Sequence, residues 1–251
     1  MELALCIALG LAIGHVMDLA FVHFYTEETF GGPLFRCAAC RAPLRARFAV
    51  PLAGWAATGG KCPDCGARLP LRGALLPLGG AALAAASYFA FDEDLVGGLL
   101  GGGFLTIFLT LTFTDFDRRL LPNRIVYPST LLAIALCWAW PDSWAGEVIA
   151  GGLVGISIGV ILFLFSLPFG AGAFGMGDVK MIILMGFVAG MPEVLVAVFV
   201  GTLAAAVVSV LLIITRVKGR KDYIPHGPFL ALGALVAIFW GAEIWDAYTG
   251  R

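Results

Sequence analysis

Charge is the scarcest property of this sequence. Only 13% of its 251 residues are Asp, Glu, Lys or Arg, about half the share of an ordinary soluble domain. The formal net charge of −1 provides no basic surface for nucleic acid, so we expect no nucleic-acid partner. Hydrophobic residues make up 60% of the chain and the mean hydropathy is +0.95. Such a chain lacks the polar surface of a soluble or disordered protein, and we predict a polytopic membrane protein embedded in a lipid bilayer.

Long apolar runs account for most of the chain. A bilayer core of about 30 Å requires roughly 20 apolar residues per helix. The runs are continuously apolar rather than alternating, which favours helices over a β-barrel. The first run follows Met1-Glu2 without a basic start or a clear cleavage site, which indicates a retained anchor. We predict about eight transmembrane helices at 3–25, 74–91, 95–114, 125–140, 146–167, 179–191, 194–215 and 227–246.

The basic residues predict the orientation of these helices. If the N-terminus lies outside, 15 of the 16 Lys and Arg residues fall in cytoplasmic loops, and only Arg251 lies outside. The outside loops then carry acidic residues such as Asp92 and Asp142. The positive-inside rule therefore selects this orientation.

Four of the six cysteines form two Cys-x2-Cys pairs, Cys37/Cys40 and Cys62/Cys65. Paired knuckles at this spacing are typical of a four-thiolate zinc site. Disulfides are the alternative, which a reducing cytoplasmic location disfavours. A closed four-thiolate site favours a structural role for zinc, although the segment could also bind a ligand. The predicted organisation is thus a first helix (1–25), a small zinc-ribbon-like cytoplasmic domain (26–73) and a membrane core (74–251), an all-α fold apart from the ribbon.

Two acidic residues at predicted helix ends are candidates for chemistry. Asp115 ends the third span, and Asp178 follows Gly175-Met176-Gly177 before the sixth. Asp178 could simply cap its helix, and Asp115 or Asp117 could pair with a neighbouring Arg. Alternatively, two carboxylates from different helices share a proton, so that one activates water while the other polarises a carbonyl. The glycines would let a backbone pass close to Asp178.

At these residues the chain resembles the type IV prepilin peptidases, which are GxGD-type intramembrane aspartic proteases. Asp115 stands seven residues before Pro122, as the first catalytic aspartate does, and Gly175-Met176-Gly177-Asp178 matches the GxGD motif of the second. The four cysteines match the family's cytoplasmic zinc domain. The resemblance implies that Asp115 and Asp178 are catalytic, with Gly175 and Gly177 in the motif. Asp117 is a candidate supporting residue, which could orient Asp115 or the basic leader of the substrate.

The resemblance also implies a setting. Such enzymes lie in the bacterial inner membrane and cut the basic cytoplasmic leader from prepilins or pseudopilins, which serve type IV pili or type II secretion. Many members then methylate the new N-terminus with S-adenosylmethionine. The implied cofactors are structural zinc and, if methylation occurs, S-adenosylmethionine.

The chain departs from the family pattern at three places. The family commonly has Gly-Ser-Phe-Leu-Asn-Val and then Arg in the first helix, where this chain has 14–19 as Gly-His-Val-Met-Asp-Leu and His23. His15 and Asp18 share a helix face and could form a buried pair or part of a site. Residues 74–80 lack the family's acidic residue, which leaves methylation open. Residues 224–230 resemble a late family motif, with His226 where Phe is usual.

Three alternatives remain at this point. The first is a peptidase without methyltransferase activity. The second is a proton-coupled transporter using Asp18, Asp115 and Asp178, although no inverted repeat is visible. The third is a zinc-dependent membrane scaffold, which would leave the GxGD sequence unexplained.

Overall fold

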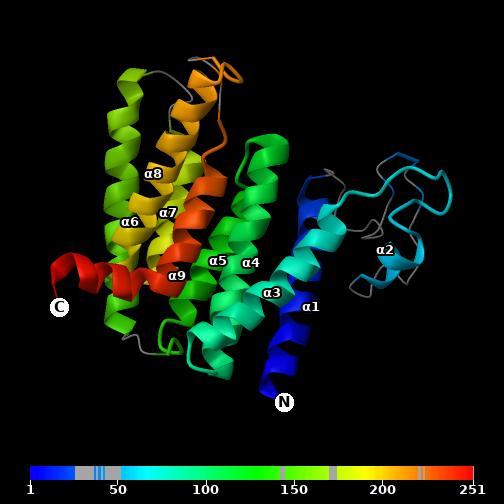
Figure 1. Cartoon of the computed structure of the whole chain (residues 1–251), viewed down its shortest axis with the longest axis horizontal. Coiled ribbons are helices and arrows are strands. Elements are labelled where there is room, and N and C mark those ends of the chain that lie inside the picture. The colour runs from blue at the N-terminus through cyan, green and yellow to red at the C-terminus, as the bar shows by residue number, and fades with distance from the viewer. Residues whose placement is uncertain are drawn as a thin grey trace. The chain divides into compact units, whose positions relative to one another are not determined.

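The computed structural model describes residues 1–25, 37, 39–40, 42, 52–141, 145–169, 174–219, 222 and 224–250 (Figure 1). The regular elements of these residues are helices, apart from one antiparallel bridge between Lys61 and Arg68. They are α1 (Glu2–Tyr25), α2 (Ala53–Ala57), α3 (Arg72–Ala90), α4 (Leu95–Arg118), α5 (Asn123–Ala135), α6 (Ala145–Ser166), the short 3-10 helix η2 (Leu167–Phe169), α7 (Met176–Ala189), α8 (Glu193–Ile214) and α9 (Gly227–Thr249). Most of the predicted cytoplasmic domain before residue 52 lies outside the described residues.

All eight apolar segments predicted as spans are helical, but the prediction of eight membrane-spanning helices is only partly confirmed. Among the residues that the structure describes, six helices are long and apolar enough to cross a membrane: α1, α3, α4, α6, α8 and α9. The helices α5 and α7 have 13 and 14 residues, which extend only about 20 Å at a 1.5 Å rise. The helix α7 ends at Gly190, whose φ of +75° breaks the helical path. A polytopic membrane protein is therefore the supported fold.

The chain divides into two compact units, Met1–Thr110 and Leu111–Arg251, so that α4 begins in the first and ends in the second. In the first unit α1 packs against α3. Gly14 lies against the carbonyl of Leu76, and Gly10 lies against Gly80. Small residues let these two backbones approach closely, as is typical of helices packed in a membrane.

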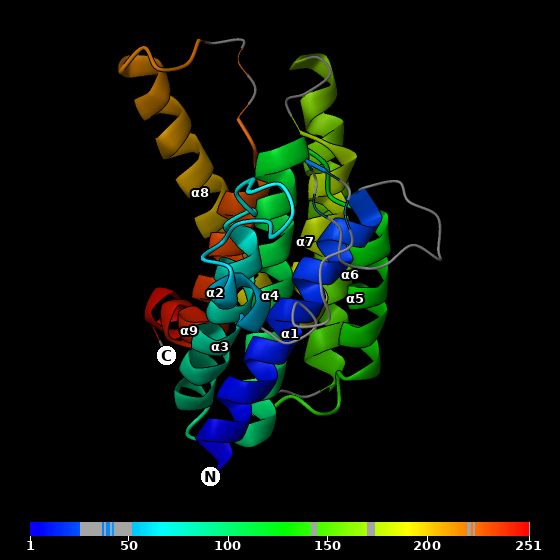
Figure 2. The same ribbon diagram turned by 90° about the vertical axis from the view of Figure 1, so that its right-hand side faces the viewer.

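The second unit is built around α7, which contacts α5, α6, α8 and α9. Figure 2 shows α7 beside α6 and α5. The helices α6 and α7 run antiparallel, because Gly151 lies against Gly186 and Gly159 lies against Val179. The helices α8 and α9 also run antiparallel, with Gly233 against the Ala197 carbonyl. This packing buries most of α7 from Asp178 onward.

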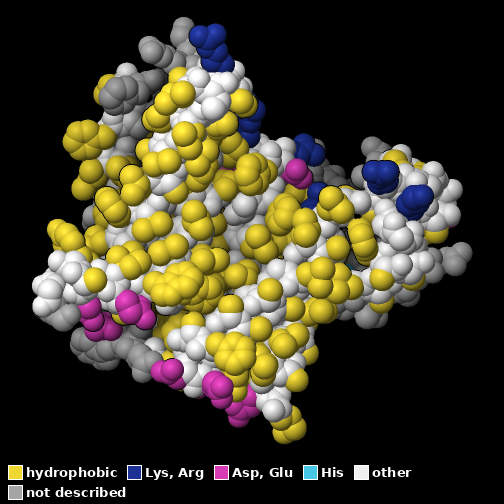
Figure 3. Space-filling model, viewed as in Figure 1, with side chains coloured by type: hydrophobic (Ala, Val, Ile, Leu, Met, Phe, Trp, Pro, Cys, Tyr) yellow, Lys and Arg dark blue, Asp and Glu magenta, His cyan; other side chains and the backbone are white. Residues whose placement is uncertain are grey.

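Apolar side chains cover much of the outside of the second unit (Figure 3). Phe165, Phe199 and Ile214 are each at least 65% exposed. Water would strongly disfavour so much exposed apolar surface, whereas lipid accommodates it. The exterior is therefore that of a multi-pass membrane protein.

Candidate active site and metal centre

Asp115 lies in the last turn of α4 and is buried, with 3% of its surface exposed. Its Oδ2 accepts a hydrogen bond of 2.8 Å from the backbone N–H of Gly227, the first residue of α9. Because the N-terminal N–H groups of a helix carry partial positive charge, this position favours an anion. The start of α9 thus holds the carboxylate of Asp115 in the last turn of α4.

Gly227 has to be a glycine for this contact. A Cβ at Gly227 would lie 2.8 Å from Oδ2 of Asp115 and 3.1 Å from its Cγ. Pro228 follows at an early position of the helix, where its missing N–H is not needed. The Gly-Pro pair therefore combines a close approach with a firm helix start.

Asp178 lies in the first turn of α7, with 6% of its surface exposed. Its Oδ2 accepts a 2.9 Å hydrogen bond from the N–H of Gly175, the N-cap residue. Capping, which the sequence left open as an alternative for Asp178, therefore does occur. It engages one carboxylate oxygen, so capping and a chemical role are compatible.

The two carboxylates lie within electrostatic range of each other in the second unit. Two contacts bring their surroundings together. Leu121, just beyond α4, lies against Gly177. A Cβ added to Gly177 would be 3.3 Å from Leu121 Cδ1. Lys180 Nζ donates a 2.8 Å hydrogen bond to Oδ1 of Asn123. The ends of α4, α5, α7 and α9 that carry these residues therefore meet at one end of the unit.

Asp117, predicted as a supporting residue, lies in the same last turn of α4 as Asp115. Its side chain is exposed, whereas Asp115 two residues earlier is buried. Residues i and i+2 do not share a helix face, which explains the difference. A role for Asp117 in the reaction stays a prediction.

Sequence reasoning missed the partners of the two aspartates. The Gly227 N–H that binds Asp115 is 112 residues away in the sequence. The only available signal was the 224–230 motif, which carried no indication of what it contacts. The ring of His226, the residue before Gly227, contacts the ring of Phe174, and its charge can act on Asp115.

The four predicted zinc ligands do come together. The sulfurs of Cys37, Cys40, Cys62 and Cys65 all lie within 4.8 Å of one another. The Sγ–Sγ distances are 3.7 Å for Cys37–Cys65 and 3.8 Å for Cys40–Cys62. Zinc–sulfur bonds of about 2.3 Å place the corners of a tetrahedron about 3.8 Å apart. The distances thus fit one four-coordinate zinc ion, and all four thiols are free rather than disulfide-bonded.

The backbone around the two knuckles supports metal binding. The N–H of Cys37 bonds to the Ala42 carbonyl, and that of Cys62 bonds to the Ala67 carbonyl, so both knuckles have the same turn. The backbone N–H groups of Cys40 and Ala39 lower the pKa of the Cys37 thiol, whereas hydrogen bonds from neighbouring sulfurs raise the pKa of Cys40. A thiolate is the form that binds zinc, and N–H donors to sulfur stabilise it.

Asp18 on α1 has a partner on α3 that the sequence did not indicate. Asp18 Oδ1 lies 3.4 Å from Nε of Arg72, at the start of α3. The Arg72 guanidinium also lies 4.1 Å from the centre of the Phe21 ring. His15 is buried on the same helix and acts on Asp18 electrostatically. The side chain of His23 lies outside the described residues.

Comparisons with known proteins identify the family. A model described as the type IV leader peptidase family matches residues 102–210, and a bacterial peptidase A24 N-terminal domain model matches residues 8–91. The chain belongs to the type IV leader peptidase family. The first match includes both aspartates, and the second includes all four clustered cysteines.

Curated relatives of this leader peptidase family cover most of the chain. A prepilin leader peptidase/N-methyltransferase of Bacillus subtilis (strain 168) is 26% identical over 98% of this chain and 97% of its own length. Proteins of the same name from Pseudomonas putida and Legionella pneumophila are 28% and 27% identical, each over 85% of this chain and over 74% and 75% of their own lengths. No solved structure matches the chain significantly.

Proposed function

We propose that the protein is an intramembrane aspartic endopeptidase in which Asp115 and Asp178 form the catalytic pair. The observation that carries the proposal is the placement of two buried carboxylates on ends of α4 and α7 that meet at one end of the second unit. Two buried carboxylates at one site cannot both ionise easily. A pair sharing one proton is the state that aspartic proteases use.

The chemistry of such a pair needs one ionised and one protonated carboxylate. The ionised group takes a proton from water as the water attacks the scissile peptide carbonyl. The protonated group donates a hydrogen bond to the carbonyl oxygen as negative charge develops there. The backbone N–H groups of Gly227 and Gly175 hold one oxygen of each carboxylate and orient the other. Titration is therefore a property of the pair and is not assigned to either residue alone.

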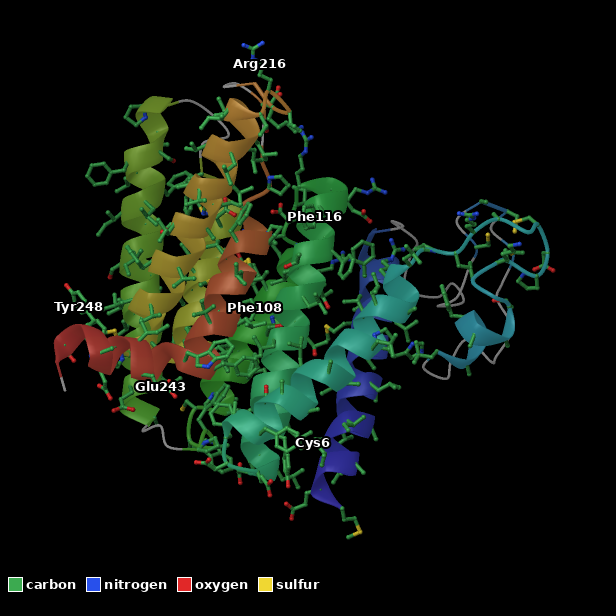
Figure 4. The ribbon with its side chains drawn as sticks, in the orientation of Figure 1. Cys6, Phe108, Phe116, Arg216, Glu243 and Tyr248 are labelled. Carbon is green, nitrogen blue, oxygen red and sulfur yellow. The ribbon has the colours of Figure 1, made fainter. Side chains whose placement is uncertain are left out.

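The orientation proposed from the sequence has support from the second unit. The helices α8 and α9 are antiparallel, so the C-terminal end of α8, just before Arg216, lies near the start of α9. Asp115 binds the start of α9, and Asp178 lies at the same end of the unit. Arg216 and Phe116 lie toward one end of the ribbon and Glu243 toward the other (Figure 4). We place the first end in the cytoplasm because of its basic residues. The alternating directions of α4 to α9 also favour eight crossings, with α5 and α7 as short spans.

The proposed substrates are prepilins or pseudopilins, whose basic leaders would reach a cytoplasmic active site. Family membership and the names of the relatives support this class of substrate. Methylation of the new N-terminus by S-adenosylmethionine is a second proposed activity. It rests on the names of those relatives alone, and the unusual residues 74–80 leave it open to a direct test.

The proposed metal is zinc held by Cys37, Cys40, Cys62 and Cys65. Four thiolates fill a tetrahedral site and leave no position for a substrate. Zinc would therefore supply folding energy to its segment.

Cleavage by single variants tests the pair. Asp115→Asn and Asp178→Asn replace an ionisable group by a neutral one of the same shape, so each should lower cleavage of a prepilin-like substrate by at least about 1,000-fold. Purified full-length enzyme is incubated with the substrate, with and without S-adenosylmethionine, and products are measured by mass spectrometry. The methyl-donor arm reports methylation separately.

Asp246→Asn is the matched control, because Asp246 is exposed near the other end of α9. It should cleave like the parent protein. Near-normal cleavage by Asp115→Asn or Asp178→Asn would overturn the catalytic pair, as would a parent protein that cleaves no prepilin-like substrate.

A further inference from the structure

Two aromatic rings connect the loops that hold the two aspartates. Phe174 directly precedes Gly175, whose N–H binds Asp178, and His226 directly precedes Gly227, whose N–H binds Asp115. The ring centres of Phe174 and His226 lie 5.7 Å apart with an angle of 71° between the planes. This edge-to-face contact is a favourable arrangement of aromatic rings. It links the two N–H donors through a single pair of side chains.

The imidazole of His226 has an unused hydrogen-bonding atom. Its Nε2 is buried and has no hydrogen-bond partner among the described residues. A buried polar atom without a partner is costly for the fold, and packing alone would be served equally well by an apolar ring. This cost points to a role for the imidazole as such.

Two carboxylates and one guanidinium of the described residues bear on this imidazole. Asp115, at the end of α4, acts on His226, and Asp178 and Arg119 act on Asp115. Burial lowers the pKa of His226 below its ordinary value, against the opposing effect of Asp115. The ring is therefore neutral at neutral pH and gains its charge only in more acidic solution.

We propose that His226 is a positioning residue for the carboxylate pair. Its ring, packed on Phe174, holds the Gly227 and Gly175 donors in a fixed relation, and its protonation in acid places a positive charge beside Asp115. This proposal rests on the proposed function, since it concerns the geometry and ionisation of the same pair.

Protonation of His226 should shift the pH dependence of cleavage in one direction. The pair is active with one carboxylate ionised and loses activity in acid as both become protonated. A positive charge beside Asp115 favours its ionised form. His226 therefore extends activity to lower pH, and its removal should move the acidic limb of the pH–rate profile upward.

Two variants separate the ring from the imidazole. His226→Phe keeps an aromatic ring but removes Nε2 and the charge. Its kcat at neutral pH should stay within about threefold of the parent value, while its acidic limb moves up by roughly 0.5–1 pH unit. His226→Ala also removes the ring contact, and its kcat should fall by about tenfold because the donors are no longer fixed. Phe174→Ala should produce a similar fall.

The double variant Phe174→Ala/His226→Ala completes the test. If the two rings act through each other, it should be about as active as either single variant, rather than the product of the two losses. Thermal unfolding of each purified protein shows whether a loss of folded enzyme accounts for the change. An acidic limb of His226→Phe that coincides with that of the parent, or independent losses in the two alanine variants, would overturn the proposal. If the parent protein cleaves nothing, the proposed function fails instead, so the two failures are distinguishable.

Discussion

Backbone N–H groups hold both carboxylates of the proposed pair. Gly227 binds Asp115 and Gly175 binds Asp178, each through Oδ2. A backbone donor has no rotamers, so it fixes its acceptor as firmly as the helix start that carries it. The position of each aspartate is therefore set by a glycine.

Substitution of these glycines by alanine tests the close approach. The Cβ of Gly227→Ala would lie 2.8 Å from Asp115 Oδ2, so Asp115 or α9 must move, and cleavage should fall by about 10- to 100-fold. The Cβ of Gly175→Ala would lie 3.3 Å from Asp178 Oδ2 and should cause a smaller loss. Initial cleavage rates at matched amounts of membrane-extracted protein measure both effects.

Gly103→Ala is the control for this series. It makes the same change within α4, where the nearest atom to the new Cβ is Ile13 Cδ1 at 3.8 Å, an ordinary contact. Its activity should equal that of the parent. Full activity of Gly227→Ala, or an equal loss in Gly103→Ala, would contradict the importance of the Gly227 approach.

At this scale the sequence predicts residues with local signatures and misses those defined by tertiary contacts. The aspartate of Gly-x-Gly-Asp and the cysteine pairs are recognisable within a few positions. The pairing of Asp115 with Gly227 joins segments 112 residues apart. Nothing in either segment alone specifies the other, so this contact could come only from the fold.

At the scale of helices, hydropathy locates each element well but fixes its ends poorly. All eight apolar runs are helical, yet α4 continues to Arg118 and so includes Asp115 and Asp117. Conversely, α5 ends at Ala135, five residues before the predicted limit. Hydropathy reports the medium around a segment, whereas helix ends depend on turns and on contacts with other elements.

The four-cysteine segment allows a metal prediction at this scale. Parent protein should contain about one zinc per chain, and Cys62→Ser should contain little, because the removed thiolate is one of four ligands. Acidification should release zinc, since protons compete for the thiolates. Zinc is measured by atomic absorption on purified protein. Cys137→Ser, outside the cluster, should retain zinc.

The cleavage activity of the same variants distinguishes a structural metal from a catalytic one. All contacts described for Asp115 and Asp178 lie within Leu111–Arg251, whereas the cysteines lie in the other unit. Cys62→Ser should therefore keep more activity than Asp115→Asn in equal amounts of folded protein. Zinc bound fully by Cys62→Ser would refute the four-thiolate site. Activity as low as that of Asp115→Asn would refute a purely structural role.

At the scale of the whole molecule, the number of crossings connects the fold to the proposed function. If α5 and α7 did not cross the membrane, the starts of α5 and α6 would lie on the same side. The antiparallel packing of α6 on α7, together with the Lys180–Asn123 hydrogen bond, instead places the start of α6 at the opposite end of the second unit from the start of α5. A short span can be accommodated by local thinning of the bilayer or by neighbouring helices.

Labelling of single cysteines with an impermeant maleimide tests both the crossings and the orientation. Arg124, Glu147, Arg216 and Glu243 are exposed positions at the two ends of this unit. Labelling is measured above that of a background without Cys6 and Cys137, which keeps the four clustered cysteines. Above this background, Glu147→Cys and Glu243→Cys should react in intact cells, and Arg124→Cys and Arg216→Cys only after permeabilisation. The reversed pattern would contradict a cytoplasmic active site. Equal labelling of Arg124→Cys and Glu147→Cys in intact cells would mean that α5 does not cross the membrane. The basic and acidic ends of this unit would then not mark the two sides of the bilayer, contrary to the positive-inside rule.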